Sequence, residues 1–292
     1  MQPSLTLSIG LPVTLCIIML GLGLSLRLED FVRVVSRPST IVVGLVCQML
    51  ILPALCFLMV YVSSLPPAIC VGMMLLAASP GGTSAALYTH LARGDVALTI
   101  SLTAITSLLS MITLPIVASL SILAFQGEED AVAVPFQQVL QIFMIAIAPA
   151  LIGAFINRRY PALAARMDRP VKMLSALFLA AVVVAALVGQ WGLLATWGTT
   201  VGTLALAFSL TSFAVGYYVP RLLRIERRQA VALAMSIGLH NAALVITLAI
   251  SEYMLNSPEM AIPPAAYGVI AYIVGGVFAW MITRQSEEAL PT

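Results

Sequence analysis

The sequence predicts an all-α polytopic membrane protein with nine transmembrane helices in a single domain. Of its 292 residues, 61% are hydrophobic and only 14 Lys and Arg and 12 Asp and Glu are charged, whereas about a quarter of the residues in a soluble domain are charged. Crossing a bilayer takes about 20 apolar residues, and nine such segments can be read. Two of these segments are interrupted by residues that disfavour a helix.

The nine spans follow one another closely along the chain. They are predicted at residues 4–26, 40–62, 67–90, 96–120, 136–156, 171–190, 196–219, 230–250 and 262–282. The longest connection, 157–170, is too short to fold alone, so residues 1–292 are predicted to form one transporter-like transmembrane domain. The first segment lacks the basic stretch that opens a signal peptide, and it is predicted to be retained as a span.

Positive charge in the connections predicts the orientation. All 14 Lys and Arg follow odd-numbered spans, and the opposite connections carry Glu128, Glu129, Asp130, Glu252 and Glu259. Because cytoplasmic loops are enriched in Lys and Arg, the N-terminus is predicted outside and the C-terminus in the cytoplasm, in a bacterial inner membrane. The net charge of +2 therefore reflects orientation in the lipid bilayer and not nucleic-acid binding.

The third and eighth spans are broken near their middles, at residues 79–84 and 236–241. Non-helical backbone at membrane depth is tolerated only where it is buried in protein or lines a cavity. Two breaks at matched places in two antiparallel segments are typical of inverted repeats that meet at a transporter's binding site. We expect a four-span repeat at 1–125 and a five-span repeat at 136–283, with the two broken helices crossing.

The first break offers groups that suit an anion. Pro80 cannot donate a backbone hydrogen bond, and the two glycines that follow free the chain from helical geometry. Thr83 or Ser84 is expected to cap a half-helix running to Tyr88, whose N-terminal N–H groups favour a negative charge. Thr83 and Ser84 are therefore predicted substrate contacts.

The second break adds Ser236, His240 and Asn241, with Gly238 expected to loosen the backbone so that carbonyl groups can face a cation. His240 is the one titratable group predicted at membrane depth, since the carboxylates all fall outside the spans. Its ordinary pKa of about 6.5 suits a proton relay, and the alternative is a neutral histidine bonded between helices. His240 and Asn241 complete the predicted substrate contacts.

Several runs resemble the bile acid:sodium symporter family. Ala78 to Thr83 followed by Tyr88 to Thr99 is similar to the family signature, and further landmarks lie at 19–24, Gln48 and 232–244. The resemblance implies a core and a panel domain, nine spans in members that lack the first, and two crossing unwound helices. It also implies a small organic anion as substrate, either a bile acid or a smaller carboxylate such as pantothenate or a 2-oxo acid, generally with sodium.

The cation positions depart from the family pattern. For the first sodium site, the resemblance implies Thr99 and Thr103 as hydroxyl ligands. At the other positions of that site, Ala85 and Ala86 replace a Ser-Asn pair and Ser236 replaces a glutamate.

The positions similar to the second sodium site are Gln48, the backbone at Ser236, Ile237 and Leu239, and the side chain of His240. The family has glutamine at the position of His240. Because a hard cation prefers oxygen ligands, we expect at most one sodium ion, no other cofactor and no transition-metal site.

The expected function is secondary active transport of an organic anion by alternating access. A sodium-independent or proton-linked facilitator or exchanger on the same fold is the first alternative, and an intramembrane enzyme or receptor is the second. Ser236 and His240 are four residues apart and share a helix face, but no third orienting group is evident, so no catalytic residue is predicted. The sequence carries no signal for an oligomeric state.

Overall fold

A computed structural model describes the chain in five stretches and a few isolated positions. The described residues are 38–82, 84–127, 151–167, 191–251 and 254–288, with the positions 16–17, 20–21, 23–24, 148–149, 170–171, 173–174, 177 and 184. The spans predicted at 4–26, 136–156 and 171–190 lie largely outside these residues. The remaining predicted spans can be compared with the structure directly.

The first described half consists of a long helix, a broken helix and a second long helix. Its elements are α3 (Pro38–Val46), η1 (Cys47–Ile51), α4 (Leu52–Tyr61), α5 (Pro67–Ala78), α6 (Ala85–Leu91) and α7 (Val96–Gln126). The elements α3, η1 and α4 form one continuous apolar helix, Pro38–Tyr61, that is long enough to cross a membrane.

The second described half repeats the order of long, broken and long helix. Its elements are α10 (Trp191–Leu222), α11 (Arg227–Gly238), α12 (Ala242–Ile250), η2 (Pro258–Ala261) and α13 (Ile262–Glu288). Two further stretches, Ala195–Leu222 and Pro258–Arg284, are long and apolar enough to span a bilayer. The structure thus confirms helices at the predicted spans it describes and breaks in the two that were predicted to be broken.

Proline explains two departures from regular helix. In η1 the N–H of Leu52 donates to the carbonyl of Cys47, five residues back, and the next residue is Pro53, which has no N–H to donate. The resulting π-turn holds Gln48, and such turns are frequent at functional sites. In α7 the axis bends by 55° between Ser110 and Ile112, where Pro115 cannot bond to the carbonyl of residue 111.

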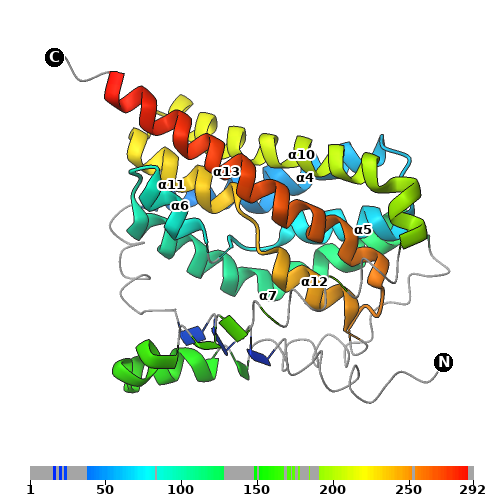
Figure 1. Cartoon of the computed structure of the whole chain (residues 1–292), viewed down its shortest axis with the longest axis horizontal. Helices are drawn as coiled ribbons and strands as arrows, with labels where there is room; N and C mark the ends of the chain where they lie inside the picture. Colours follow the sequence, from blue (N-terminus) through cyan, green and yellow to red (C-terminus); the bar gives the residue numbers. More distant parts are fainter. Residues whose placement is uncertain are drawn as a thin grey trace.

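The two broken helices cross at the centre of the bundle. In Figure 1, α6 and α11 lie together at one end and α5 and α12 lie together at the other. The described side chains of α11 from Ala230 to Gly238 are all buried, and many are small, which lets α10 approach closely. A Cβ added at Gly216 in α10 would lie 2.7 Å from the Cα of Ala234.

The described outer surface is apolar, and the basic connections share one end of the bundle. Exposed large side chains on α4, α7 and α13 include Leu58, Leu120 and Ile273, as expected of a protein in hydrocarbon. Figure 1 places the α6–α7 connection, the α10–α11 connection and the end of α13 at the same end. This agrees with the predicted orientation, which, with the nine spans and the inverted repeat, stays a prediction.

Candidate functional site at the helix crossing

The two breaks hold each other through backbone hydrogen bonds. Gly81 and His240 form an isolated antiparallel bridge. On either side of it, the N–H of Gly82 donates to the carbonyl of Leu239, and the N–H of Asn241 donates to the carbonyl of Pro80 at 2.9 Å. Backbone groups that would otherwise be unpaired at membrane depth are satisfied by the partner break, which stabilises the crossing.

Glycine is required at the point of closest approach. A Cβ added at Gly81 would lie 2.8 Å from the carbonyl oxygen of Ser236 and 2.9 Å from Thr103 Oγ1. Real Cβ atoms do not approach backbone this closely, so a larger residue would push α11 away from the first break. The glycine pair read from the sequence as a source of backbone freedom therefore also serves close packing.

Two buried polar side chains converge on the carbonyl oxygen of Ser79. Gln48 donates to it from Nε2 at 3.2 Å, and His240 Nδ1 lies 3.4 Å from it. The other polar atom of each side chain, Gln48 Oε1 and His240 Nε2, is buried and has no hydrogen-bond partner among the described residues. Because buried polar atoms normally have partners, these two atoms make Gln48 and His240 candidates for contacting a polar ligand.

Aromatic rings fix the orientation of the His240 ring. Phe208 of α10 stacks on it with ring centroids 5.4 Å apart and an interplanar angle of 20°. Tyr267 of α13 meets it edge-on at 5.5 Å and donates its hydroxyl to the carbonyl of Gly238 at 2.8 Å. Sequence reasoning missed both aromatic residues, because they come from spans that carry no break.

The hydroxyl groups matched to the first sodium site bond to protein groups. Thr103 Oγ1 lies 3.1 Å from Ser236 Oγ, which joins α7 to α11. Thr99 Oγ1 lies 2.9 Å from Thr89 Oγ1 and 3.3 Å from the carbonyl oxygen of Ala232, to which it donates. The structure brings Thr99, Thr103 and Ser236 together along one interface, where their hydroxyls bond to one another or to backbone carbonyls. These groups offer oxygen ligands but no carboxylate to balance the charge of a cation.

One of the backbone carbonyls expected to face a second cation already has a partner. The carbonyl of Leu239 accepts the N–H of Gly82 and keeps one lone pair for another contact. Gln48 Oε1 remains as a buried oxygen without a partner among the described residues, and such an oxygen fits a hard cation. The surroundings of Gln48 thus fit a single sodium ion better than those of Thr103 do.

Asn241 has a structural role that the sequence did not reveal. It is the N-cap of α12, and its Oδ1 accepts the N–H of Leu244 at 3.1 Å. A side-chain cap of this kind stabilises a helix by about 1 kcal/mol. The amide NH2 remains the group that can donate to an anion.

Ser84 does not act as the expected helix cap. It stands at the N-cap position of α6, and no side-chain cap bond to the described residues of that helix is formed. Its hydroxyl instead lies 2.9 Å from the hydroxyl of Tyr272 in α13. The half-helix also runs on to Leu91, beyond the predicted end at Tyr88, and Thr83 lies outside the described residues.

Tyr88 lies beside Ser84 and Tyr272 and contacts Tyr272. The Tyr88 hydroxyl donates to the carbonyl of Tyr272 at 3.2 Å, and the two rings stack with centroids 5.9 Å apart. Nearly half of the Tyr272 surface is exposed. Ser84, Tyr88 and Tyr272 therefore form a partly exposed cluster of hydroxyl groups on α6 and α13.

Ser236 and His240 do not form a pair. The Ser236 hydroxyl faces Thr103 on α7, whereas the His240 ring lies between Phe208 and Tyr267. The two side chains therefore point to different neighbours, although the residues are four positions apart. This arrangement does not provide a nucleophile activated by a base.

Comparison with known proteins adds an independent observation. Residues 12–197 match the Sodium Bile acid symporter family. The chain is 28% identical over 276 residues to the uncharacterized sodium-dependent transporter YocS of Bacillus subtilis, covering 94% of this chain and 84% of that protein. It is 27% identical over 279 residues to the probable chloroplastic sodium/metabolite cotransporter BASS1 of Arabidopsis thaliana, covering 95% and 68%.

A human protein extends the comparison. The chain is 24% identical over 247 residues to the ileal sodium/bile acid cotransporter, covering 84% of this chain and 70% of that protein. The family and these relatives are transporters and not enzymes. With more than half of its length matched and the two broken helices in place, the chain belongs to the sodium bile acid symporter family.

Proposed function

We propose that this membrane transporter carries a small organic anion by alternating access around the crossing of its broken helices, coupled to at most one sodium ion. The bond between Asn241 and Pro80 and the bridge between Gly81 and His240 support this proposal, because they build irregular backbone at membrane depth. In membrane proteins such backbone is retained where it binds a substrate or an ion.

The observation that carries the proposal is the pair of unsatisfied buried atoms beside Ser79. Gln48 Oε1 accepts and His240 Nε2 can donate or accept, and neither finds a partner among the described residues. Leaving a buried polar group unpaired costs about 1–3 kcal/mol. A sodium ion at Gln48 Oε1 and a hydrogen bond between the substrate and His240 Nε2 would satisfy both atoms and explain why the fold retains them.

The donor groups favour an anionic substrate. The Asn241 amide and the hydroxyls of Ser84 and Tyr272 can each donate to a carboxylate. Thr83, which directly precedes Ser84 in the sequence, is proposed as a further contact. Related proteins are named as carriers of organic anions and bile acids, so we propose the same class here, either a bile-acid-like molecule or a smaller carboxylate such as pantothenate or a 2-oxo acid.

The residues around Gln48 would hold the one sodium ion. Sodium bound there supplies positive charge close to the place where an anion enters, and Gln48 and nearby backbone carbonyls supply the oxygen ligands. The proposed setting is the bacterial inner membrane, with the repeats at 1–125 and 136–283 and the N-terminus outside.

Counterflow in proteoliposomes tests the proposal. Purified protein is reconstituted in vesicles preloaded with an unlabelled candidate anion, and entry of the same labelled anion is followed with and without a sodium gradient. We expect the vesicles to accumulate at least one labelled carboxylate. Accumulation should be absent from vesicles without protein and from vesicles with the Gly81→Val variant, whose side chain cannot fit against Ser236. Binding without counterflow for every anion tested would contradict transport.

A sodium-independent or proton-linked carrier is the second candidate. The hydroxyl bond between Thr103 and Ser236 favours it, because these two groups at the interface of α7 and α11 satisfy each other without a cation. Counterflow that is equally fast in sodium and in potassium would support this candidate. His240 would then be the residue to vary first.

A further inference from the structure

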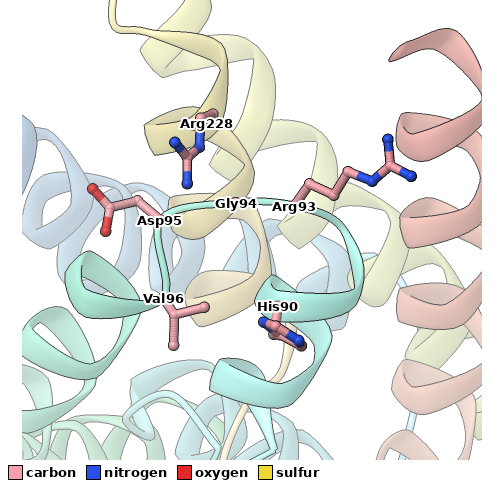
Figure 2. Close-up of a pocket in the computed structure, with 6 residues that line it drawn as sticks. All are labelled: His90, Arg93, Gly94, Asp95, Val96 and Arg228. Atoms are coloured by element: carbon pink, nitrogen blue, oxygen red, sulfur yellow. The ribbon is translucent and has the colours of Figure 1, made fainter. Parts of the chain in front are cut away.

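A cavity lies away from the crossing, where the end of α6, the start of α7 and the first turn of α11 meet. Its volume is about 550 Å³, and its lining consists of His90, Arg93, Gly94, Asp95, Val96 and Arg228. Figure 2 shows these residues around the turn that joins α6 to α7. None of them belongs to the site at the crossing.

Backbone bonds fix the floor of this cavity. Arg93 has a left-handed backbone, with φ 55°, and the N–H of Gly94 donates to the carbonyl of Thr89 at 2.8 Å, which together close α6 in a Schellman turn. A Cβ at Gly94 would lie 2.8 Å from the Thr89 side chain and 2.9 Å from that of Val231. The turn therefore packs tightly against α11.

A further bond ties the turn to the other half of the chain. The N–H of Asp95 donates to the carbonyl oxygen of Arg228 at 3.0 Å. The side chain of Arg228 is thereby carried on backbone that is held against the α6–α7 turn. The cavity walls are thus positioned by main chain, although the arginine side chains themselves are exposed.

The lining is richer in basic than in acidic groups. It contains two arginines and His90, and Asp95 is its acidic member. Asp95 Oδ1 accepts the N–H of Leu98 at 3.1 Å and caps α7, so its charge also serves the helix. Figure 2 shows the Arg228 guanidinium above the turn and the Arg93 side chain extending outward.

We propose that this cavity binds a phosphate group, held by Arg228 and His90. Guanidinium groups bind phosphate through paired charge-assisted hydrogen bonds, and the volume admits a phosphate with a small substituent. The phosphate belongs either to a free anion or to a phospholipid headgroup. Either occupant bridges the α6–α7 turn and α11, so it stabilises the contact between the two broken helices independently of transported substrate.

Thermal unfolding of the purified full chain in detergent tests this site. The probe is inorganic phosphate, added at constant ionic strength against chloride, and binding raises the midpoint of unfolding. We expect Arg228→Gln and His90→Gln to weaken the apparent phosphate affinity by about fivefold or more, since each removes a hydrogen bond to a charged ligand. His90→Gln also serves as the second variant if Arg228→Gln expresses poorly.

Arg224→Gln is the matched control. Arg224 is exposed, as Arg228 is, and lies outside the cavity lining. The Arg224→Gln substitution removes the same charge as Arg228→Gln but does so outside the cavity. It should therefore leave the stabilisation by phosphate unchanged. Equal loss of response in Arg224→Gln and Arg228→Gln would show general charge attraction and overturn the proposal.

Lipid discs distinguish the two sources of phosphate. If a headgroup fills the cavity, discs of phosphatidylglycerol stabilise the wild type more than discs of phosphatidylcholine, this difference disappears in Arg228→Gln, and free phosphate adds nothing in phosphatidylglycerol. If a free anion fills it, inorganic phosphate stabilises the protein in both lipids. Absence of any Arg228-dependent stabilisation, from phosphate and from lipid alike, would reject the site.

Discussion

Thr103 Oγ1 and Ser236 Oγ lie 3.1 Å apart and form a hydrogen bond that joins α7 to α11 beside the crossing. The same interface holds the bond from Thr99 to the carbonyl of Ala232. Both hydroxyl groups at 103 and 236 can be satisfied without an ion, and neither brings the charge of a carboxylate. The two hydroxyl groups at the first cation position therefore bond to each other, and no carboxylate accompanies them there.

Transport should consequently depend on sodium without cooperativity or not at all. Uptake into proteoliposomes is measured against sodium concentration at several pH values, for the wild type and for His240→Gln. We expect a Hill coefficient for sodium of about one at most, because one-site binding gives no cooperativity. A coefficient clearly above one, unchanged by the substitution, would mean that other groups rebuild the first site.

Two substitutions at Asn241 should separate its role in helix capping from its proposed role in substrate binding. In Asn241→Asp the carboxylate still accepts the N–H of Leu244, so stability is retained, but the amide donor is lost and a negative charge meets the anion. Asn241→Ala loses the cap as well, at a cost of about 1 kcal/mol. Thermal unfolding and binding of a transported labelled anion measure the two effects. An Asp variant that binds the anion as tightly as wild type would exclude Asn241 as a contact.

The sequence predicted the broken helices well because Pro80, Gly81 and Gly82 are strong local signals at membrane depth. It could also place Gln48 and His240 near the crossing, since each stands at a position similar to the family pattern. Their shared partner, the carbonyl of Ser79, depends on tertiary packing and was not predictable.

Other features were missed for a similar reason. Tyr272 and Phe208 come from unbroken spans, where an aromatic residue is usually a packing residue. The cap role of Asn241 and the bond from Ser84 to Tyr272 are set by which helices come together. Local sequence indicates where a helix breaks but not which neighbour satisfies the groups that the break exposes.

Close helix packing can be tested at Gly216. Gly216→Ala places a Cβ 2.7 Å from Ala234 Cα, and backbone cannot move aside cheaply, so we expect a loss of about 1–3 kcal/mol in the free energy of unfolding. Gly202→Ala in the same helix is the control, since no described atom lies within 4 Å of its Cβ. Alanine there should be neutral or stabilising by up to about 1 kcal/mol. Equal thermal unfolding midpoints for the two variants would contradict the α10–α11 contact.

Tyr272 should contribute to substrate binding through its hydroxyl. Tyr272→Phe removes the bond to Ser84 but keeps the ring that stacks on Tyr88, so the fold should be unaffected. Loss of one hydrogen bond to the ligand is expected to weaken anion binding by about 1 kcal/mol. Tyr218→Phe, on the exposed end of α10, is the control. Equilibrium binding of a transported labelled anion is measured for Tyr272→Phe and Tyr218→Phe. Equal affinities of the two variants would refute a role for the Tyr272 hydroxyl.

The orientation can be tested with two exposed turn residues that share a left-handed backbone, Asn256 with φ 46° and Arg224 with φ 61°. Asn256 precedes η2 on the side predicted to face outward, and Arg224 follows α10 on the side predicted to be cytoplasmic because of its basic connections. Each is changed to cysteine in a variant without the native cysteines. A membrane-impermeant thiol reagent should label Asn256→Cys in intact cells and Arg224→Cys only after permeabilisation. The reverse pattern would invert the topology, and labelling of both in intact cells would place the two turns on one face and rule out the predicted arrangement of the spans between them.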